Sequence, residues 1–118
     1  MAAVLVLACS VAGICGEMDD LLSNAKTQGR PVMLEFGSKV CAPCLQMEPV
    51  LKRLVKEYPG RLDVVSVDVN AYHDFSVAHG VRVLPTQVFL DKNGKEFNRH
   101  YGYYPYEEIK EALRKAGL

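Results

Sequence analysis

Apolar and polar positions change along the chain in blocks that predict helices and strands in turn. Residues 47–58 repeat apolar side chains at helical spacing, which is typical of one buried face of an amphipathic helix. Residues 31–36 and 62–69 are short and mostly apolar, as in central strands. The whole pattern predicts helices over residues 17–29, 41–58, 71–79 and from 105 onward, and strands over 31–36, 62–69, 86–90 and 95–101.

Glycine and proline refine this pattern at the ends of the elements. Asn93-Gly94 predicts a hairpin turn between the last two strands, because this pair accepts positive φ at low cost. Pro49 predicts a kink in the long helix. Strands that alternate with helices imply a parallel portion, and the hairpin adds an antiparallel edge. We therefore expect one α/β domain with a central mixed four-stranded sheet and helices on both faces.

The first block of the chain differs from the rest because residues 1–16 carry no charged side chain. The block is shorter than the roughly 20 apolar residues that span a bilayer, and it fits the apolar core of a secretory signal. Residues 10–12 form a tolerable cleavage site, and the residues before Cys9 resemble a bacterial lipoprotein box. The alternative is a fifth strand over residues 4–8. We expect a leader over 1–16, a domain over 17–118, and an exported protein that is periplasmic or lipid-anchored facing the periplasm.

Charge narrows the classes of partner. The chain has 118 residues, enough for one domain, and its 14 basic and 14 acidic residues cancel. No block of lysine and arginine stands out, which argues against nucleic-acid binding and polybasic membrane attachment. A domain of this size buries most of its surface without stabilising disulfides. We expect a monomer.

The candidate chemistry lies in Cys41-Ala42-Pro43-Cys44, which follows a predicted strand and opens a predicted helix. A helix N-terminus offers unpaired N–H groups and positive potential that stabilise a thiolate. Two intervening residues in a helical turn bring the sulfurs within bonding distance. Cys41 lies at the open end, where it can be attacked, and Cys44 lies deeper, where it can resolve a mixed disulfide. This arrangement predicts thiol–disulfide exchange.

Two other readings of the cysteine pair are a zinc site and a static structural disulfide. Zinc would need two more ligands, and none stands at zinc-like spacing. We expect His73, His79 and His100 to be ordinary surface or loop residues. A C-x-x-C pair at a helix start in an α/β frame favours redox use over both alternatives. We expect no metal and no cofactor besides the Cys41–Cys44 disulfide.

From residue 31 to 117 the chain resembles thioredoxin. The resemblance rests on PVMLEF at 31–36, CAPC at 41–44, Pro49, HGVRVLPT at 79–86, KNGKE at 92–96 and Gly102. Several features agree in order, so the match is more specific than the cysteine motif alone. Within that family the chain is most similar to small exported bacterial thioredoxin-like proteins. The resemblance implies a thioredoxin fold.

The resemblance also implies roles for individual residues. Cys41 matches the attacking thiol and Cys44 the resolving thiol. Pro85 matches a cis-proline that faces the pair, which would leave the Leu84 backbone free to bind an extended substrate as an added strand. A plain strand-initiating proline is the alternative.

Glu35 stands where the family often carries a buried aspartate, six residues before Cys41. A buried carboxylate beneath the pair could exchange a proton with Cys44, and burial would raise its pKa to suit that role. The alternative is a partly solvated acid on a strand.

Other positions depart from the family's pattern and bear on substrate choice. Val40 stands where tryptophan is usual, Ala42-Pro43 replaces Gly-Pro, and Ser66 or its neighbours replace a basic residue. By resemblance Tyr101 and Gly102 would lie beside the pair and border a peptide groove. The alternative is a packed strand end and helix cap. We expect Val40, Ala42, Pro43, Leu84, Pro85, Tyr101 and Gly102 to contact substrate.

The direction of electron flow follows from the residues between the cysteines. Ala42-Pro43 offers no charge to stabilise a reduced thiolate, which favours a reducing pair. We therefore expect a reductase acting on protein thiols and disulfides. An exported reductase would need electrons from across the membrane, and resemblance suggests a membrane thiol carrier. The alternatives are a disulfide oxidase or isomerase, and a non-enzymatic module that binds extended peptides.

Overall fold

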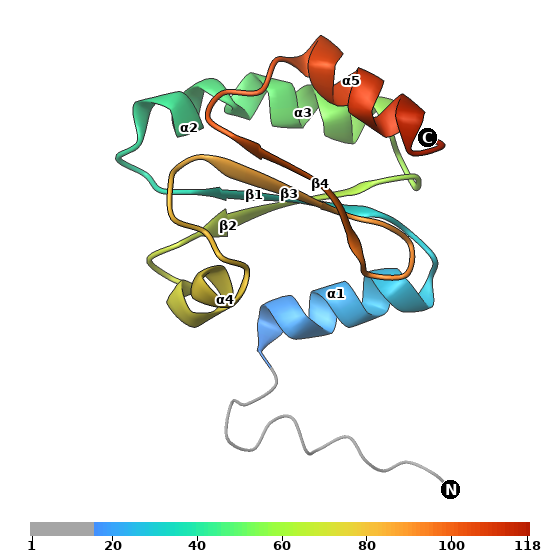
Figure 1. Cartoon of the computed structure of the whole chain (residues 1–118), viewed down its shortest axis with the longest axis horizontal. Coiled ribbons are helices and arrows are strands. Elements are labelled where there is room, and N and C mark those ends of the chain that lie inside the picture. Colours follow the sequence, from blue (N-terminus) through green and yellow to red (C-terminus); the bar gives the residue numbers. More distant parts are fainter. Residues whose placement is uncertain (1–15) are drawn as a thin grey trace, which may run out of the picture.

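The computed structural model describes residues 16–118, and the predicted leader, lipoprotein box and fifth strand lie outside these residues. The chain forms helices and strands in the predicted order (Figure 1). The elements are α1 (Glu17–Thr27), β1 (Val32–Gly37), α2 (Ala42–Gln46), α3 (Glu48–Glu57), β2 (Asp63–Asp68), α4 (His73–Ala78), β3 (Thr86–Leu90), β4 (Glu96–Tyr101) and α5 (Tyr106–Lys115). Among residues 16–118, no helix is both long and apolar enough to cross a membrane.

The sheet has four strands in the order β2-β1-β3-β4. β1 pairs in parallel with β2 and antiparallel with β3, and β3 pairs antiparallel with β4. Val32 to Phe36 of β1 are all buried, as expected of an inner strand covered on both faces. The mixed four-stranded sheet is confirmed.

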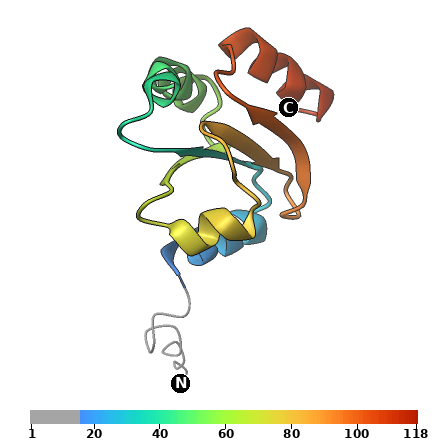
Figure 2. The same cartoon turned by 60° about the vertical axis from the view of Figure 1, so that its left-hand side comes forward.

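Helices cover both faces of the sheet. α1 and α4 lie on one face, and α2, α3 and α5 lie on the other (Figure 1), which the rotated view in Figure 2 also shows. Side chains of β1 point alternately into two cores, Met33 into one and Leu34 into the other. The core beneath α3 and α5 also holds Met47, Val50, Leu54, Tyr58, Leu62, Phe89, Tyr104, Tyr106, Ile109 and Leu113.

The long helix predicted over residues 41–58 is divided into α2 and α3 at Met47. Pro49 has no N–H to donate to the carbonyl of Leu45, so the regular bonding of one helix cannot run through this point. The Met47 N–H instead bonds the Cys44 carbonyl at 3.1 Å, and the Met47 carbonyl begins the bonding of α3 through Leu51. α2 is therefore a separate short helix that carries the cysteines.

Candidate active site

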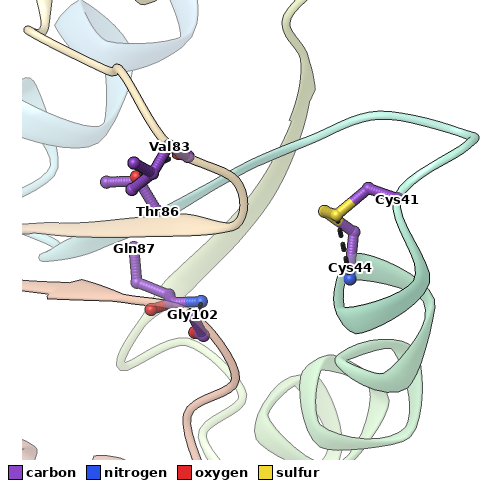
Figure 3. Close-up of a disulfide and its surroundings, with 6 residues drawn as sticks. All are labelled: Cys41, Cys44, Val83, Thr86, Gln87 and Gly102. Atoms are coloured by element: carbon purple, nitrogen blue, oxygen red, sulfur yellow. Dashed lines mark hydrogen bonds between the residues drawn. A yellow bond between two sulfur atoms is a disulfide. The ribbon is translucent and has the colours of Figure 1, made fainter.

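The two cysteines form a disulfide at the start of α2 (Figure 3). Cys41 is the N-cap of the helix in extended conformation, and its Cα lies 5.2 Å from that of Cys44. The Cys44 N–H donates to the Cys41 sulfur at 3.3 Å. Exposed Ala42 and Pro43 fill the first turn, where proline fits because no N–H bond is required. An N–H aimed at the Cys41 sulfur also favours a thiolate there.

Cys44 packs directly against the end of β1. A methyl group built on Gly37 would lie 3.1 Å from the Cys44 sulfur and 3.2 Å from its Cβ. Glycine at this position therefore lets the helix that bears the pair approach the sheet.

Glu35 lies in the sheet beneath the pair. The Glu35 and Cys44 side chains line one cleft of about 230 Å³, with Lys39, Glu48 and Asp68 also on its wall. Glu35 is 4% exposed, and neither of its carboxyl oxygens has a hydrogen-bond partner among the described residues. Burial raises the pKa of Glu35 to about 7, and the nearby Gln87 amide opposes this effect more weakly. The expectation of a desolvated acid holds, whereas a solvated strand acid does not fit this burial.

The turn before β3 contains a cis Leu84–Pro85 peptide bond. The Thr86 hydroxyl donates to the Val83 carbonyl at 2.6 Å, and the Gly102 N–H donates to the Pro85 carbonyl at 2.7 Å. Gly102 has φ +87°, a conformation that other residues rarely adopt, so this contact depends on glycine. In Figure 3 the turn, marked by Val83 and Thr86, and Gly102 lie opposite the end of α2 that bears the disulfide. No hydrogen bond among the described residues involves the Leu84 backbone.

The remaining predicted contact residues differ in exposure. Val40 is 91% exposed and Tyr101 is 56% exposed, so both side chains are free to meet a partner. The aromatic run after residue 100 is divided, because Tyr104 and Tyr106 are buried in the core while Tyr101 and Tyr103 are exposed. Both earlier interpretations of this run therefore describe part of it. The roles of these residues in binding stay predictions.

The sequence analysis missed Gln87, the polar neighbour of Glu35 on β3, and was wrong about one of the three histidines. Gln87 is fully buried and bonds both His100 and Gly102. His73 is exposed and His79 lies half-buried beside Phe75 in the turn after α4, as expected, whereas His100 lies half-buried on β4 and stacks on a tyrosine. A glutamine inside the predicted strand TQVFL was the available signal for Gln87. Within the described residues, no group of three or more His, Cys, Asp or Glu side chains is placed to hold a metal ion.

Comparison with known proteins gives consistent relatives. Residues 18–117 match the family model described as a thioredoxin-like domain. The chain is 32% identical over 99 residues to thioredoxin 1 of Chlorobaculum tepidum, covering 84% of this chain and 94% of that protein. It is 36% identical over 66 residues to a thioredoxin of Borreliella burgdorferi, covering 56% of each. The chain thus spans about half the length of some curated relatives and nearly all of others.

Solved structures agree with this assignment. A thioredoxin of Fasciola hepatica superposes with a TM-score of 0.74 at 28% identity, covering 83% of this chain and 89% of that one. A poplar thioredoxin h gives the same TM-score and identity, with 86% of this chain and 89% of that chain covered. The central sheet and its two helical layers are thus those of a thioredoxin fold. The family model matches nearly all of the residues that the structure describes, and this chain therefore belongs to the family of thioredoxin-like domains.

Proposed function

We propose that the protein is a thiol–disulfide oxidoreductase that reduces disulfides in exported proteins. The observation that carries this proposal is the Cys41–Cys44 disulfide, which has a backbone N–H on one sulfur and a desolvated carboxyl in the cleft beside the other. A static disulfide would need neither group. Together they supply a stabilised thiolate and a proton acceptor.

The reaction begins from the reduced pair. The Cys41 thiolate attacks one sulfur of the substrate disulfide, so a mixed disulfide forms and the other substrate sulfur leaves as a thiolate that takes up a proton. The Cys44 thiolate then attacks the Cys41 sulfur and releases the second substrate thiolate, which is also protonated. The protein dithiol loses two electrons and two protons, and the substrate disulfide gains them.

Glu35 is the proposed base for the second step. A carboxyl with a pKa of about 7 is partly ionised near neutral pH, so it can accept the Cys44 proton and later return it. The carboxyl and Cys44 line the same cleft, which gives the proton a short path, directly or through water.

Substrate would bind as an extended segment along the turn before β3. The Leu84 backbone has no partner among the described residues and can pair with a substrate strand. Val40, Val83 and Tyr101 are exposed apolar side chains available to flank that strand. Ala42, Pro43, Pro85 and Gly102 would complete the contact by shape.

The direction of electron flow and the cellular setting form the finer part of the proposal. The uncharged Ala42-Pro43 pair supports a reductase. The uncharged block over residues 1–16 supports export, and an exported reductase would draw electrons from a membrane thiol carrier. Intact-mass measurement of the protein from its native host tests export, because a retained leader would contradict it.

The first experiment is the reduction potential of the Cys41–Cys44 pair, measured by equilibration in defined thiol–disulfide buffers. A value below about −240 mV supports the reductase. A value above about −180 mV would instead indicate an oxidase or isomerase.

Trapping separates the two cysteines. Cys44→Ser should accumulate mixed disulfides with substrate, because Cys41 still attacks and nothing resolves the product. Cys41→Ser should abolish turnover and trap no mixed disulfide, because it removes the attacking thiol at the open end of α2. A Cys41→Ser protein that still turns over disulfides would refute the assigned roles.

A further inference from the structure

A row of polar side chains crosses the sheet beneath the cysteine pair. Ser66, Glu35, Gln87 and His100 are Cα partners on the four successive strands β2, β1, β3 and β4. Directly opposite residues have their side chains on the same face of a sheet. The row therefore places Gln87 and His100 on the same face as Glu35, among side chains that are otherwise mostly apolar.

Gln87 is held in one orientation by two hydrogen bonds. Its Nε2 donates to the Gly102 carbonyl at 3.1 Å, and its Oε1 lies 3.0 Å from Nδ1 of His100. An amide oxygen only accepts, so Nδ1 of His100 carries the proton in this contact. The two ends of the amide are thereby distinguished, although the residue is fully buried.

His100 is itself fixed by stacking. Its ring lies 3.7 Å from that of Tyr104, with an angle of 5° between their planes. Tyr104 is buried and its hydroxyl accepts a hydrogen bond from Asn98 at 3.2 Å. The imidazole therefore keeps its Nδ1–H directed at Gln87.

Gln87 is the cross-strand neighbour of Glu35. Nε2 carries two hydrogens, and the Gly102 carbonyl accepts one of them. Cross-strand neighbours such as Glu35 and Gln87 have Cβ atoms roughly 5 Å apart, which keeps the amide beside the carboxyl. The Gln87 amide accordingly lowers the pKa of Glu35 against the larger effect of burial. A reversed amide would present its oxygen and favour the protonated acid.

Other titratable groups line the same cleft as Glu35. Lys39 precedes α2, Glu48 begins α3 and Asp68 ends β2, while α2 contributes Cys44. None of these groups belongs to β3 or β4. The line of neighbours from β4 to the carboxyl runs from His100 through Gln87.

We propose that Gln87 and His100 are positioning residues for Glu35: His100 holds the Gln87 amide with its N–H groups toward the carboxyl, so that Glu35 keeps its carboxylate form for the Cys44 proton. The pair acts through Glu35 and touches neither sulfur in this role. The inference rests on the proposed function for its link to Cys44, whereas the effect on Glu35 is independent of turnover.

The test is the titration of Glu35 in the oxidised full-length protein, followed by carboxyl ¹³C NMR. His100→Phe keeps a ring to stack on Tyr104 but removes the donor, and Gln87→Leu removes the amide. Each should make Glu35 harder to ionise by roughly threefold to tenfold, which moves its titration midpoint up by about half to one pH unit. In the Gln87→Leu background, His100→Phe should add nothing. His100→Asn, which retains an N–H donor, should bring the Glu35 midpoint most of the way back to that of the unmutated protein.

His79→Phe is the matched control, because His79 is also half-buried beside aromatic rings but packs against Phe36 of the other core. It should leave the Glu35 midpoint in place. The proposal is overturned if folded His100→Phe and Gln87→Leu proteins titrate like the unmutated one, if His79→Phe shifts Glu35 equally, or if the two effects add.

The pH dependence of substrate-thiol release supplies the second readout. Its inflection should follow the Glu35 midpoint in each variant, which a merely structural defect would not produce. An unmutated protein that reduces no disulfide at all would refute the proposed function, while the titration would still decide whether His100 acts on Glu35 through Gln87.

Discussion

At the scale of single residues, the buried carboxyl of Glu35 makes stability depend on pH. Burial raises its pKa from 4.5 to about 7. Between these values the folded protein binds more protons than the unfolded chain, so the free energy of unfolding falls as pH rises through this window. The loss is complete above about pH 7 and amounts to roughly 3 kcal/mol.

Glu35→Gln should remove this dependence. The difference in free energy of unfolding between the variant and the unmutated protein should be about 2–3 kcal/mol more favourable to the variant at pH 8 than at pH 4. The variant has no charge to bury at the higher pH. Urea unfolding of the oxidised proteins at both pH values measures the gain. Glu111→Gln, at an exposed acid of α5 paired with Arg114, should keep the unmutated pH dependence. Equal pH dependence in the Glu35→Gln and unmutated proteins would contradict the assignment of a desolvated acid.

Gly37 controls how closely Cys44 approaches the sheet. Gly37→Ala would bring a methyl group to 3.1 Å from the Cys44 sulfur, so α2 or the sulfur must move. We expect a loss of about 1 kcal/mol in stability and a severalfold slower release of substrate thiol. Gly16→Ala serves as control, because its methyl group would meet its nearest neighbour at an ordinary 3.5 Å. Unmutated kinetics in Gly37→Ala would show that this approach does not matter for the reaction.

At the scale of elements, α3 and α5 are joined by a polar contact at their outer edge. The Arg53 guanidinium lies 3.7 Å from the centre of the Tyr106 ring and bonds Glu57 at 3.1 Å. The Tyr106 hydroxyl also bonds Glu57. The pKa of Tyr106 is raised from 10.0 to about 12, chiefly by burial and secondly by this hydrogen bond.

Tyr106→Phe should test this contact while keeping the ring. Without the hydroxyl, the variant should be about 1 kcal/mol less stable at neutral pH. Between pH 10 and 12 the folded protein holds a proton that the unfolded chain has lost, so the unmutated protein loses stability there, and the variant should lose less. Urea unfolding at pH 7 and across the alkaline range measures both effects. Tyr103→Phe, at an exposed tyrosine, should change neither, and a Tyr106→Phe protein with the unmutated alkaline slope would refute the mechanism.

At the scale of the whole molecule, one sheet serves two cores. Because alternate residues of β1 enter opposite cores, damage to either should weaken the same cooperative transition. Leu34→Ala and Leu54→Ala, at fully buried positions on opposite faces, should each cost about 2–5 kcal/mol.

Far-UV circular dichroism and tyrosine fluorescence should report coincident unfolding in both variants. Val77→Ala, at a valine that is 59% exposed, should change stability by less than about 0.5 kcal/mol. Separate transitions for the two probes would show that the cores unfold independently.

The order of elements could be predicted from the sequence because periodicity and turn chemistry act locally. Predicted strands over residues 62–69 and 95–101 correspond to β2 and β4 within a residue at each end. The interruption that Pro49 predicted in the helix over residues 41–58 is present, but it falls at Met47 and divides the helix into α2 and α3. The cysteine pair could also be predicted, because its residue types and spacing carry the chemistry, whereas Glu35 was singled out by its place in the family's pattern.

By itself the sequence determined the order of the chain's elements and the place of its cysteine pair, since each depends on neighbours in the chain. Only the tertiary structure decided that Gln87 and His100, separated from Glu35 by more than half of the described chain, stand in one row with it. It also decided that both oxygens of Glu35 are buried without a partner among the described residues. The reason is physical: strand register and desolvation arise when distant segments pack, and no local pattern records them.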